Sequence, residues 1–466
     1  MPKPIAILAL AVLSMCCDTP AAREQGQSVD LVIANGIVVT MDGTSRVINP
    51  GSVAIRGTTI VAVGAADAIA KSYQANDTID ARDRVVMPGL INTHTHAPMV
   101  LYRGLGDDLA LMDWLQKYIF PAEAKTVSPV FVRTGTELAA LEMIRSGTTA
   151  YVDMYYFEEE IARATKRAGL RGVLGQTIIE FPVADAKTPA EALKRSETFI
   201  REFLNDELIT PAVAPHAVYT NDARTLTAAR ELASRYDVPM VIHLAETEAE
   251  TKMSLERHKA RPVAALEALG FFNGRVIAAH GVWIQPDEIQ LLRKRGGGVA
   301  HNPESNMKLA SGTAPVPAYL RADVALGLGT DGAASNNDLD MFEAMRQAAF
   351  LHKLTSNDPQ AVSARTALEL ATIGGARVIG RAKDLGSLEP GKRADVIIVR
   401  MDQPRHTPMY DPISHLVYTT RGDDVDTTIV NGRVLMRGGK VLSLDEGAVL
   451  AAARKAADQV RAAVQP

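Results

Sequence analysis

Short runs of hydrophobic residues recur along the middle of the chain, and a polar residue follows or closes each run. Runs of this length, with helix-like patterns between them, are typical of buried parallel strands in repeated βα units. Helical patterns lie at 133–145, 161–168 and 222–236, for example. The predicted strands end near His94, Asp153, Gln176, His216, His243, His280, His301 and Asp331. Eight such strands predict an α/β fold built on a TIM-like (β/α)₈ barrel.

The two ends of the chain have a different pattern, with strand-like runs and tight-turn signals. In the segment 29–64, Asn35-Gly36 between apolar runs predicts a hairpin. The segment 393–435 again contains strand-like runs, with a second turn signal at Asn431-Gly432. Neither end alone has enough strands for independent stability. We therefore expect both ends to combine into one composite β-sandwich beside the barrel.

These patterns divide the chain into five parts. The parts are an export signal and linker at 1–28, the first part of the sandwich at 29–88, the barrel at 89–380, the second part of the sandwich at 381–440, and a C-terminal helix within 441–466.

Composition narrows the class of protein. The 466 residues, 47% of them hydrophobic, are enough for a large buried core. A formal net charge of −4, with both signs mixed along the chain, argues against nucleic-acid binding. No apolar run approaches the roughly 20 residues of a transmembrane helix. We expect a small-molecule substrate and a homo-oligomer.

The first residues have the layout of a bacterial export signal. A short basic start at Lys3 precedes the apolar run 5–13, and small and polar residues follow. Cys16 and Cys17 are the only cysteines, and 13–16 resembles a lipoprotein signal except that Met15 stands where a small residue is preferred. The sequence predicts an exported protein, periplasmic or lipid-anchored at Cys16 or Cys17. The alternative is a cytoplasmic enzyme.

The pair His94 and His96 is the first candidate for metal chemistry. Residues i and i+2 of a strand project to the same side, so both imidazoles can reach one divalent cation. Further histidines and an aspartate end other predicted strands, and in a (β/α)₈ barrel the chemistry gathers at those ends. So many metal-competent side chains at strand ends favour a metal site over buried structural histidines.

Longer motifs resemble those of a known family. They are Pro-Gly-Leu-Ile-Asn-Thr-His-Thr-His at 88–96, His-Leu-Ala-Glu-Thr at 243–247 and Gly-Thr-Asp-Gly-Ala-Ala-Ser-Asn-Asn-Asp at 329–338, with further similar runs at 301–312 and 385–395. The segment 29–440 resembles the amidohydrolase superfamily, and within it the methylthioadenosine/S-adenosylhomocysteine deaminase and chlorohydrolase branch. This resemblance implies the barrel, the composite sandwich and one catalytic divalent metal.

The resemblance also implies which residues bind that metal. By position they are His94, His96, His243 and Asp331. Three imidazoles and one carboxylate leave a place for water, as a catalytic site requires. Binuclear branches carry a bridging lysine at the end of the fourth barrel strand, where this chain has His216. We therefore expect a single ion, zinc by default, with iron or manganese as alternatives.

Three residues are candidates for the chemistry. A bound divalent metal lowers the pKa of its water toward ~7, and attack on a ring carbon requires a proton on the neighbouring ring nitrogen. Glu246 is the predicted proton shuttle, Asp331 the acceptor of the first proton, and His280 a hydrogen-bonding partner of the attacking hydroxide. The alternative for Glu246 is an exposed loop glutamate near Glu248 and Glu250. The alternative for His280 is a buried histidine with a structural role only.

The resemblance assigns substrate contacts as well. Glu123 matches the acidic residue that contacts ribose hydroxyls, and a carboxylate is a sound acceptor for them. His216, Glu246 and Asp331 complete the predicted substrate-binding set. The alternative for Glu123 is a helix-start glutamate after Pro121, favoured by the helix dipole.

Other residues are weaker candidates. Trp114 and Tyr118 could cover the ligand or pack in the core, and His301 and Asn302 could support the pocket or be structural. Relatives that use S-adenosylhomocysteine can place an arginine near the third strand. Arg171 lies at the start of that strand, the wrong end of a barrel, which favours a substrate with a neutral tail.

The sequence thus predicts a metal-dependent hydrolytic deaminase. Its expected substrate is an adenine nucleoside such as 5′-methylthioadenosine, adenosine or S-adenosylhomocysteine, with release of ammonia. The alternatives are a guanine deaminase or a triazine-type chlorohydrolase on the same scaffold, or a non-catalytic exported metal-binding protein.

Overall fold

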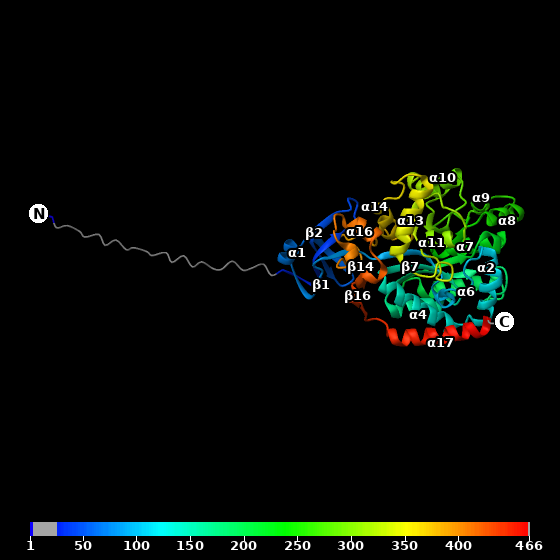
Figure 1. Cartoon of the computed structure of the whole chain (residues 1–466), viewed down its shortest axis with the longest axis horizontal. Coiled ribbons are helices and arrows are strands. Elements are labelled where there is room, and N and C mark those ends of the chain that lie inside the picture. Colours follow the sequence, from blue (N-terminus) through cyan, green and yellow to red (C-terminus); the bar gives the residue numbers. More distant parts are fainter. Residues whose placement is uncertain (3–25, 465–466) are drawn as a thin grey trace.

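Figure 1 shows the computed structural model of the chain, which describes residues 1–2 and 26–464. The predicted export signal, with its candidate lipid-anchor cysteines, lies outside the described residues. The described part contains no helix long and apolar enough to cross a membrane.

Eight parallel strands form the barrel. They are β6 (Leu90–Thr95), β7 (Thr148–Tyr155), β8 (Arg171–Ile178), β9 (Ile209–Pro215), β10 (Met240–Leu244), β11 (Val276–His280), β12 (Gly298–His301) and β13 (Ala325–Leu328), hydrogen-bonded in chain order. Each predicted strand end lies within three residues of the observed one. The Thr93 hydroxyl donates to the Leu328 carbonyl (2.8 Å), and the Asp331 amide donates to the His94 carbonyl (3.0 Å). These bonds join the last strand to the first, so the barrel is nearly closed and the predicted fold class is confirmed.

Helices surround this barrel. The larger ones are α4 (Pro129–Arg145), α5 (Glu158–Ala168), α6 (Pro189–Phe203), α7 (Ala223–Tyr236), α8 (Glu248–His258), α10 (Pro286–Arg295), α13 (Met341–Ser356) and α17 (Glu446–Val464). The shorter ones are α1 (Ala66–Ser72), α2 (Leu111–Trp114), α3 (Phe120–Thr126), α9 (Pro262–Ala268), α11 (Pro303–Lys308), α12 (Val316–Arg321), α14 (Ala364–Glu369), α15 (Gly375–Val378) and α16 (Pro412–Tyr418). Short 3₁₀ or π-helical turns are η1 (Ala97–Tyr102), η2 (Leu115–Ile119), η3 (Val218–Thr220), η4 (Leu370–Gly374), η5 (Pro404–His406) and η6 (Gly422–Asp424). Side chains of Ser128, Thr188, Asp222 and Thr247 cap the N-termini of α4, α6, α7 and α8 by accepting a backbone hydrogen bond.

The two ends of the chain meet in a second sheet. Its strands are β1 (Gln27–Val39), β2 (Val47–Arg56), β3 (Thr59–Ala65), β4 (Tyr73–Asp80), β5 (Arg84–Pro88), β14 (Val396–Arg400), β15 (Val425–Val430), β16 (Arg433–Arg437) and β17 (Lys440–Val441). The order is β17-β16-β15-β14-β5-β1-β2-β3, with β4 paired to β1. Antiparallel pairing of β5 with β14 joins the N-terminal strands to the C-terminal ones. Residues of both ends, among them Ile33, Val53, Val86 and Ile398, share one buried cluster.

One predicted turn is wrong. Asn35-Gly36 does not end a hairpin, because β1 runs through it to Val39. The pairing of β1 with β2 shifts register there, and Asn35 has a φ of 63° while its amide donates to the Ser52 hydroxyl (3.2 Å). This is a β-bulge, which uses the same residue types as a hairpin turn. Asn431-Gly432, in contrast, joins β15 to β16 with φ values of 53° and 75°, as the two-residue turn predicts.

A buried ion pair fixes the second sheet against the barrel. Arg171, at the start of β8, donates from Nε to Asp395 Oδ2 (2.7 Å) and from Nη2 to Asp395 Oδ1 (3.2 Å) and Asn431 Oδ1 (2.7 Å). Both charged side chains are about 5% exposed or less. Removing either member of this ion pair is costly, because the charge of the other member would remain buried without a counter-charge.

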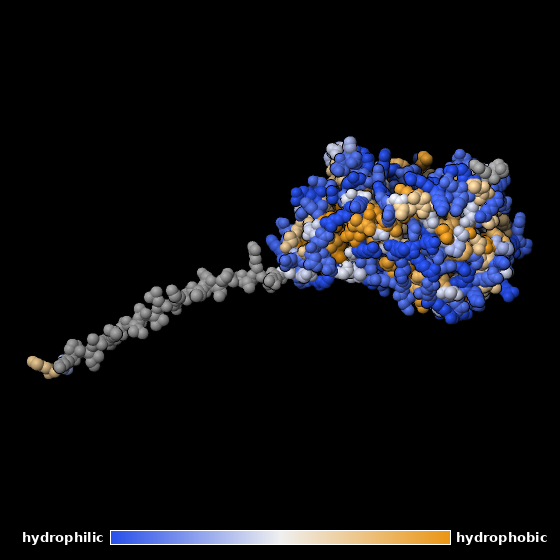
Figure 2. Space-filling model, turned by 90° about the horizontal axis from the view of Figure 1, so that it is seen from below, coloured by the Kyte–Doolittle hydropathy of each residue, from blue (hydrophilic) through white to orange (hydrophobic). Residues whose placement is uncertain are grey.

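The C-terminal helix α17 lies along the outside of α3 and α4 (Figure 1). It buries Val449, Ala453, Ala456 and Val460 against them. Seen from the α17 side, the surface is mostly hydrophilic, and the largest hydrophobic group lies toward the end of the molecule that carries the second sheet (Figure 2). Because α3 carries Glu123, α17 also supports one wall of the site described next.

Candidate metal centre and active site

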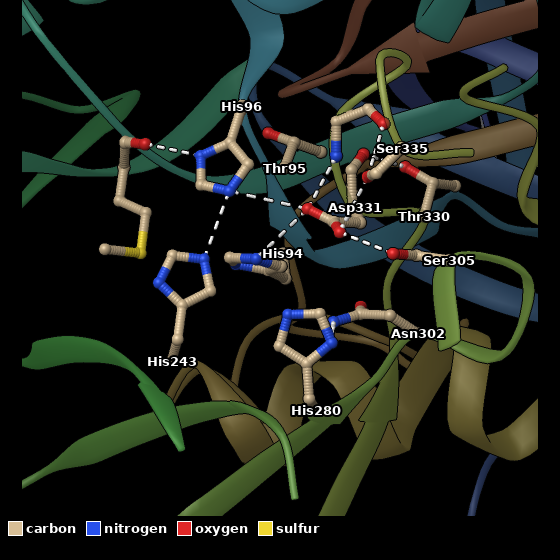
Figure 3. Close-up of polar contacts among 12 residues, drawn as sticks. His94, Thr95, His96, His243, His280, Asn302, Ser305, Thr330, Asp331 and Ser335 are labelled. Carbon is tan, nitrogen blue, oxygen red and sulfur yellow. Dashed lines mark hydrogen bonds and ion pairs between the residues drawn. The ribbon is translucent and has the colours of Figure 1, made fainter. Parts of the chain in front are cut away.

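The four predicted metal ligands lie together at the carboxyl ends of the strands (Figure 3). His94 Nε2 and His96 Nε2 are each 3.4 Å from Asp331 Oδ1, and His96 Nε2 is 3.2 Å from His243 Nε2. His94, His96 and Asp331 each offer a ligand atom within 4.8 Å of the others, as do His94, His243 and His280. The strands thus bring into one cluster residues that are up to 237 positions apart (94 to 331).

The state of His94 shows that this cluster suits a cation. Neither ring nitrogen of His94 makes a well-aligned hydrogen bond among the described residues, although the side chain is fully buried; Nε2 has only the ion-pair contact with Asp331 Oδ1 at 3.4 Å. Burial lowers the pKa of His94 to about 4, so the imidazole is neutral and its lone pair is free. A buried nitrogen without a partner is unfavourable unless an electron-pair acceptor lies nearby. Three imidazoles and a carboxylate are ligands that zinc, iron and manganese accept.

Backbone carbonyls orient two of these imidazoles. His96 Nδ1 donates to the Met154 carbonyl (2.7 Å), and His243 Nδ1 donates to the His216 carbonyl (2.8 Å). With the proton on Nδ1, the lone pair of each Nε2 faces the cluster. Burial, reinforced by the neighbouring histidines, places the pKa of His243 well below its usual value.

Hydroxyl groups orient the carboxylate. Asp331 Oδ2 accepts hydrogen bonds from Ser305 Oγ (2.7 Å) and Ser335 Oγ (2.8 Å), while Oδ1 accepts one from the Gly332 amide (2.7 Å). Burial alone would raise the pKa of Asp331, but His94 and His96 outweigh it and hold the pKa well below the usual value. The sequence interpretation missed both serines, although Ser305 lies inside the 301–312 motif and Ser335 inside the 329–338 motif.

Glu246 and His280 face each other beside this cluster. The carboxylate Oε2 of Glu246 lies 3.8 Å from His280 Nε2, and both residues are buried. Burial raises the pKa of Glu246. Burial opposes protonation of His280, but Glu246 and Asp331 outweigh it and raise the pKa of the imidazole. The alternative interpretation of Glu246 as an exposed loop glutamate therefore does not fit the structure.

Two asparagines contact the far side of His280. Nδ1 of His280 lies 2.9 Å from Asn306 Oδ1, to which it donates, and 3.3 Å from Asn302 Nδ2. Asn302 was a predicted supporting residue, and the structure places it in that position. Asn306 was not predicted, although it lies in the 301–312 motif.

A pocket of about 600 Å³, including space open to solvent, leads from the surface to these residues. Apart from the metal cluster, Glu246 and His280, its walls include Met99, Leu111, Trp114, Leu115, Ile119, Phe120, Glu123, Met154, Tyr155, Tyr156, Thr177, His216, Tyr219, Leu309 and Ser335. Trp114 therefore borders the ligand space. Tyr118 is not among the lining residues and is 41% exposed.

Glu123 and His216, the other predicted substrate contacts, both line this pocket. The Tyr155 hydroxyl donates to Glu123 Oε1 (2.6 Å), and burial raises the pKa of Glu123 to about 7. His216 Nδ1 lies 3.1 Å from the Thr220 hydroxyl, and burial lowers the pKa of His216 to about 3. One wall of the pocket thus carries a titratable acid and a neutral imidazole.

Two other residues lie away from the pocket. His301 Nε2 is 2.9 Å from His352 Nε2 in a separate buried pair, which makes His301 structural. Arg171 holds the second sheet at the opposite end of the barrel, as its place at the start of a strand predicts. Toward the other end of that strand, Gln176 Nε2 donates to Asp185 Oδ2 (2.8 Å), so its amide is bound to a neighbouring carboxylate.

A second hollow adjoins the pocket at Glu123. The two share Phe120, Glu123 and Tyr156, and the second is further lined by Ala124, Phe181, Pro182, Val183, Ala184 and Lys187. The rings of Phe120 and Phe181 meet edge to face at 5.4 Å. The hollow is therefore mainly apolar, with one lysine among its lining residues.

Comparisons with known proteins identify relatives of this chain. Residues 85–435 match the Amidohydrolase family. The chain is 46% identical over 432 residues to a 5-methylthioadenosine/S-adenosylhomocysteine deaminase of Syntrophobacter fumaroxidans, covering 93% of this chain and 98% of the relative. It is 45% identical over 438 residues to a 5′-deoxyadenosine deaminase of Methanosarcina mazei, covering 93% and 99%. A crystal structure of an adenosine deaminase from Xanthomonas campestris with bound zinc has a TM-score of 0.92 and 39% identity, covering 94% of this chain and 100% of that one.

Proposed function

The chain belongs to the amidohydrolase family, and on this premise we propose that it is a metal-dependent hydrolytic deaminase of adenine nucleosides. The observation that carries the proposal is the pairing of Glu246 with His280 beside three histidines and an aspartate, in a pocket that Glu123 and His216 also line. A protein that only carried metal would not need the buried, protonatable Glu246. The deaminase names of the relatives agree with this activity.

His94, His96, His243 and Asp331 would hold the metal, and we propose zinc. A divalent cation in such a site lowers the pKa of water to near neutrality and so supplies the nucleophile. The zinc in the similar Xanthomonas structure supports this choice. Iron and manganese remain compatible with the same ligands.

Glu246 would carry the proton during turnover. In the proposed reaction, the oxygen of water bonds to the purine carbon that bears the amino group, while a proton passes from Glu246 to the adjacent ring nitrogen. Asp331 accepts the proton that the water loses, and His280 hydrogen-bonds the attacking oxygen. Asp331 then passes its proton to the amino group, the carbon–nitrogen bond breaks and ammonia leaves. The hydroxyl proton of the adduct returns to Glu246, which leaves the 6-oxopurine nucleoside and restores both carboxyl groups. The raised pKa of the Glu246 carboxyl supports this role, because burial favours the protonated form, which is the form that donates.

Glu123 and His216 would bind the nucleoside. A carboxylate accepts hydrogen bonds from two ribose hydroxyls, and Glu123 lies at the point where the pocket meets the apolar hollow. The apolar part of that hollow suits an uncharged 5′ substituent, such as the methylthio group of 5′-methylthioadenosine, and Lys187 is the one cationic side chain among its lining residues. The neutral Gln176 on the third barrel strand supports the same preference.

A substrate panel tests the proposal. Purified protein loaded with zinc is incubated with adenosine, 5′-methylthioadenosine, 5′-deoxyadenosine, S-adenosylhomocysteine, guanine and a chlorinated triazine, and ammonia or chloride release is followed. We expect adenine nucleosides to have the highest kcat/KM, with the uncharged 5′ substituents ahead of S-adenosylhomocysteine. A higher kcat/KM for guanine or the triazine would overturn the nucleoside assignment.

A further inference from the structure

The backbone that carries Glu246 has an unusual conformation. Strand β10 ends at Leu244, and Ala245 then adopts a φ of 50°. A left-handed residue other than glycine is unfavourable by itself and persists only where its surroundings impose it. Glu246 follows this residue at once, so the direction of its side chain depends on whatever holds Ala245.

The buried side chain of Glu250 holds this backbone from one side. Its Oε1 accepts a hydrogen bond from the Ala245 amide (2.9 Å), and its Oε2 accepts one from the Glu246 amide (2.8 Å). Glu250 is 1% exposed. One carboxylate thus spans two successive N–H groups on either side of the turn.

The segment after His280 holds the same backbone from the other side. The amides of Val282 (3.0 Å) and Trp283 (2.8 Å) both donate to the Ala245 carbonyl. His280 itself has a φ of 74°. The turn that carries Glu246 and the turn that follows His280 are therefore hydrogen-bonded to each other. Glu250 binds the amides of the first turn.

We propose that Glu250 is a positioning residue for the proton-transfer step: its carboxylate fixes the turn at Ala245, so that Glu246 faces His280 and the metal ligands. This role rests on the proposed function of Glu246. A carboxylate is needed because two amides point at it and both require an acceptor. A glutamine would offer one acceptor oxygen and turn an NH₂ group toward the second amide.

The substitution Glu250→Gln tests the proposal, because it keeps the size of the side chain and removes one acceptor. We expect kcat for adenosine, per metal-loaded molecule, to fall by about 10- to 100-fold, because a displaced Glu246 loses part of the roughly 10²- to 10⁴-fold contribution of a positioned proton-transfer group. Bound metal should change by less than about twofold, because no metal ligand is altered, and the loss should fall on kcat more than on KM. Glu248→Gln is the matched control: it lies in the same turn of α8 but is 58% exposed and should behave as wild type.

Amide hydrogen exchange gives a second measurement that does not depend on turnover. In the wild-type protein we expect the Ala245 and Glu246 amides to exchange slowly, and Glu250→Gln to accelerate them by about tenfold or more while α7 stays unchanged. Wild-type kcat in Glu250→Gln, or a loss that only follows metal content or folded fraction, would overturn the proposal. If the variant does not fold, rapid exchange of these two amides in the wild type would overturn it.

The two measurements also separate this inference from the proposed function. A wild-type protein that deaminates no nucleoside would refute the activity, and the exchange rates would still decide whether Glu250 holds the turn. Normal deamination with rapid exchange at Ala245 and Glu246 would refute the positioning role alone.

Discussion

The hydroxyl of Tyr155 donates a 2.6 Å hydrogen bond to Oε1 of Glu123 in the wall of the pocket. Tyr155 comes from barrel strand β7 and Glu123 from α3, so this bond fixes the covering segment to the barrel. It is the one hydrogen bond that the described residues give to this carboxylate, which leaves Oε2 available to a ligand. The predicted contact with ribose therefore depends on a residue that sequence reasoning did not identify.

Glu123→Ala is expected to lower kcat/KM for substrates that bear both ribose hydroxyls. Loss of a hydrogen bond to a charged group costs about 1.5–3 kcal/mol, so kcat/KM for adenosine should fall by about 10- to 100-fold. Steady-state kinetics with adenosine and 2′,3′-dideoxyadenosine measure the difference. Equal losses on both nucleosides would contradict the assigned contact.

The pH dependence of stability should reveal the buried carboxyl of Glu123. Its pKa is about 7 in the folded protein and near 4.5 in the unfolded chain, so the folded state holds the proton more tightly between these values. Stability contributed by the neutral form is thus present below pH 4.5 and is lost as pH rises through 7. The variant Glu123→Gln has no carboxyl group to ionise at this position, so it does not lose stability in this way. Its free energy of unfolding relative to wild type should increase between pH 5 and pH 8, by up to about 3 kcal/mol. Urea unfolding at both pH values provides the measurement, and a pH-independent difference would show that the carboxyl does not titrate in this range.

Glu246→Gln should retain metal and lose turnover. The amide keeps the size of the side chain but cannot carry the proton, so kcat should fall by about 10²- to 10⁴-fold. Metal content by elemental analysis and ammonia release on adenosine measure the two effects. Wild-type kcat in this variant would remove Glu246 from the mechanism.

Removal of the metal should abolish activity reversibly. Dialysis against a chelator is expected to eliminate ammonia release, and added zinc to restore it, because the remaining residues supply no strong nucleophile. His94→Ala should not be rescued by zinc, since it deletes one of the four proposed ligands of the metal. Zinc should raise the Tm of the wild type, because a ligand that binds only the folded state stabilises it. Full activity in the chelated protein would exclude a catalytic metal.

Cell fractionation tests the predicted export. The basic start, apolar run and following small and polar residues favour a processed protein outside the cytoplasm. Immunodetection should find the mature form in the periplasmic or membrane fraction, and Cys16→Ser together with Cys17→Ser should release a lipid-anchored form from membranes. A full-length product in the cytoplasm would refute the prediction. The homo-oligomer is likewise still a prediction.

The barrel was predictable because each strand has a sharp boundary between apolar and polar residues. Ile242 and His243, for example, are neighbours in the sequence but serve the core and the site respectively. The bulge at Asn35 was not predictable from the same reasoning. Asn-Gly satisfies a positive φ in a hairpin and in a bulge alike, and only the pairing with β2 distinguishes them.

The supporting residues of the site were mostly beyond sequence reasoning. Met154 and His216 contribute backbone carbonyls, which any residue could supply. Glu250 resembles the exposed Glu248 in the sequence, and only the path of the chain after β10 buries it. Contacts of this kind form where strand ends that are distant in the sequence come together, so no local sequence pattern predicts them.

The pairing of β5 with β14 has a consequence for synthesis on the ribosome. Pro88 is made early, but its partner Val396 emerges 308 residues later (396 minus 88). At about 5–20 residues per second, the nascent chain waits about 15–60 s with that strand edge unpaired. Unpaired edges invite intermolecular pairing, so chaperones that shield nascent chains should matter more for this protein than for one whose strands pair with near neighbours.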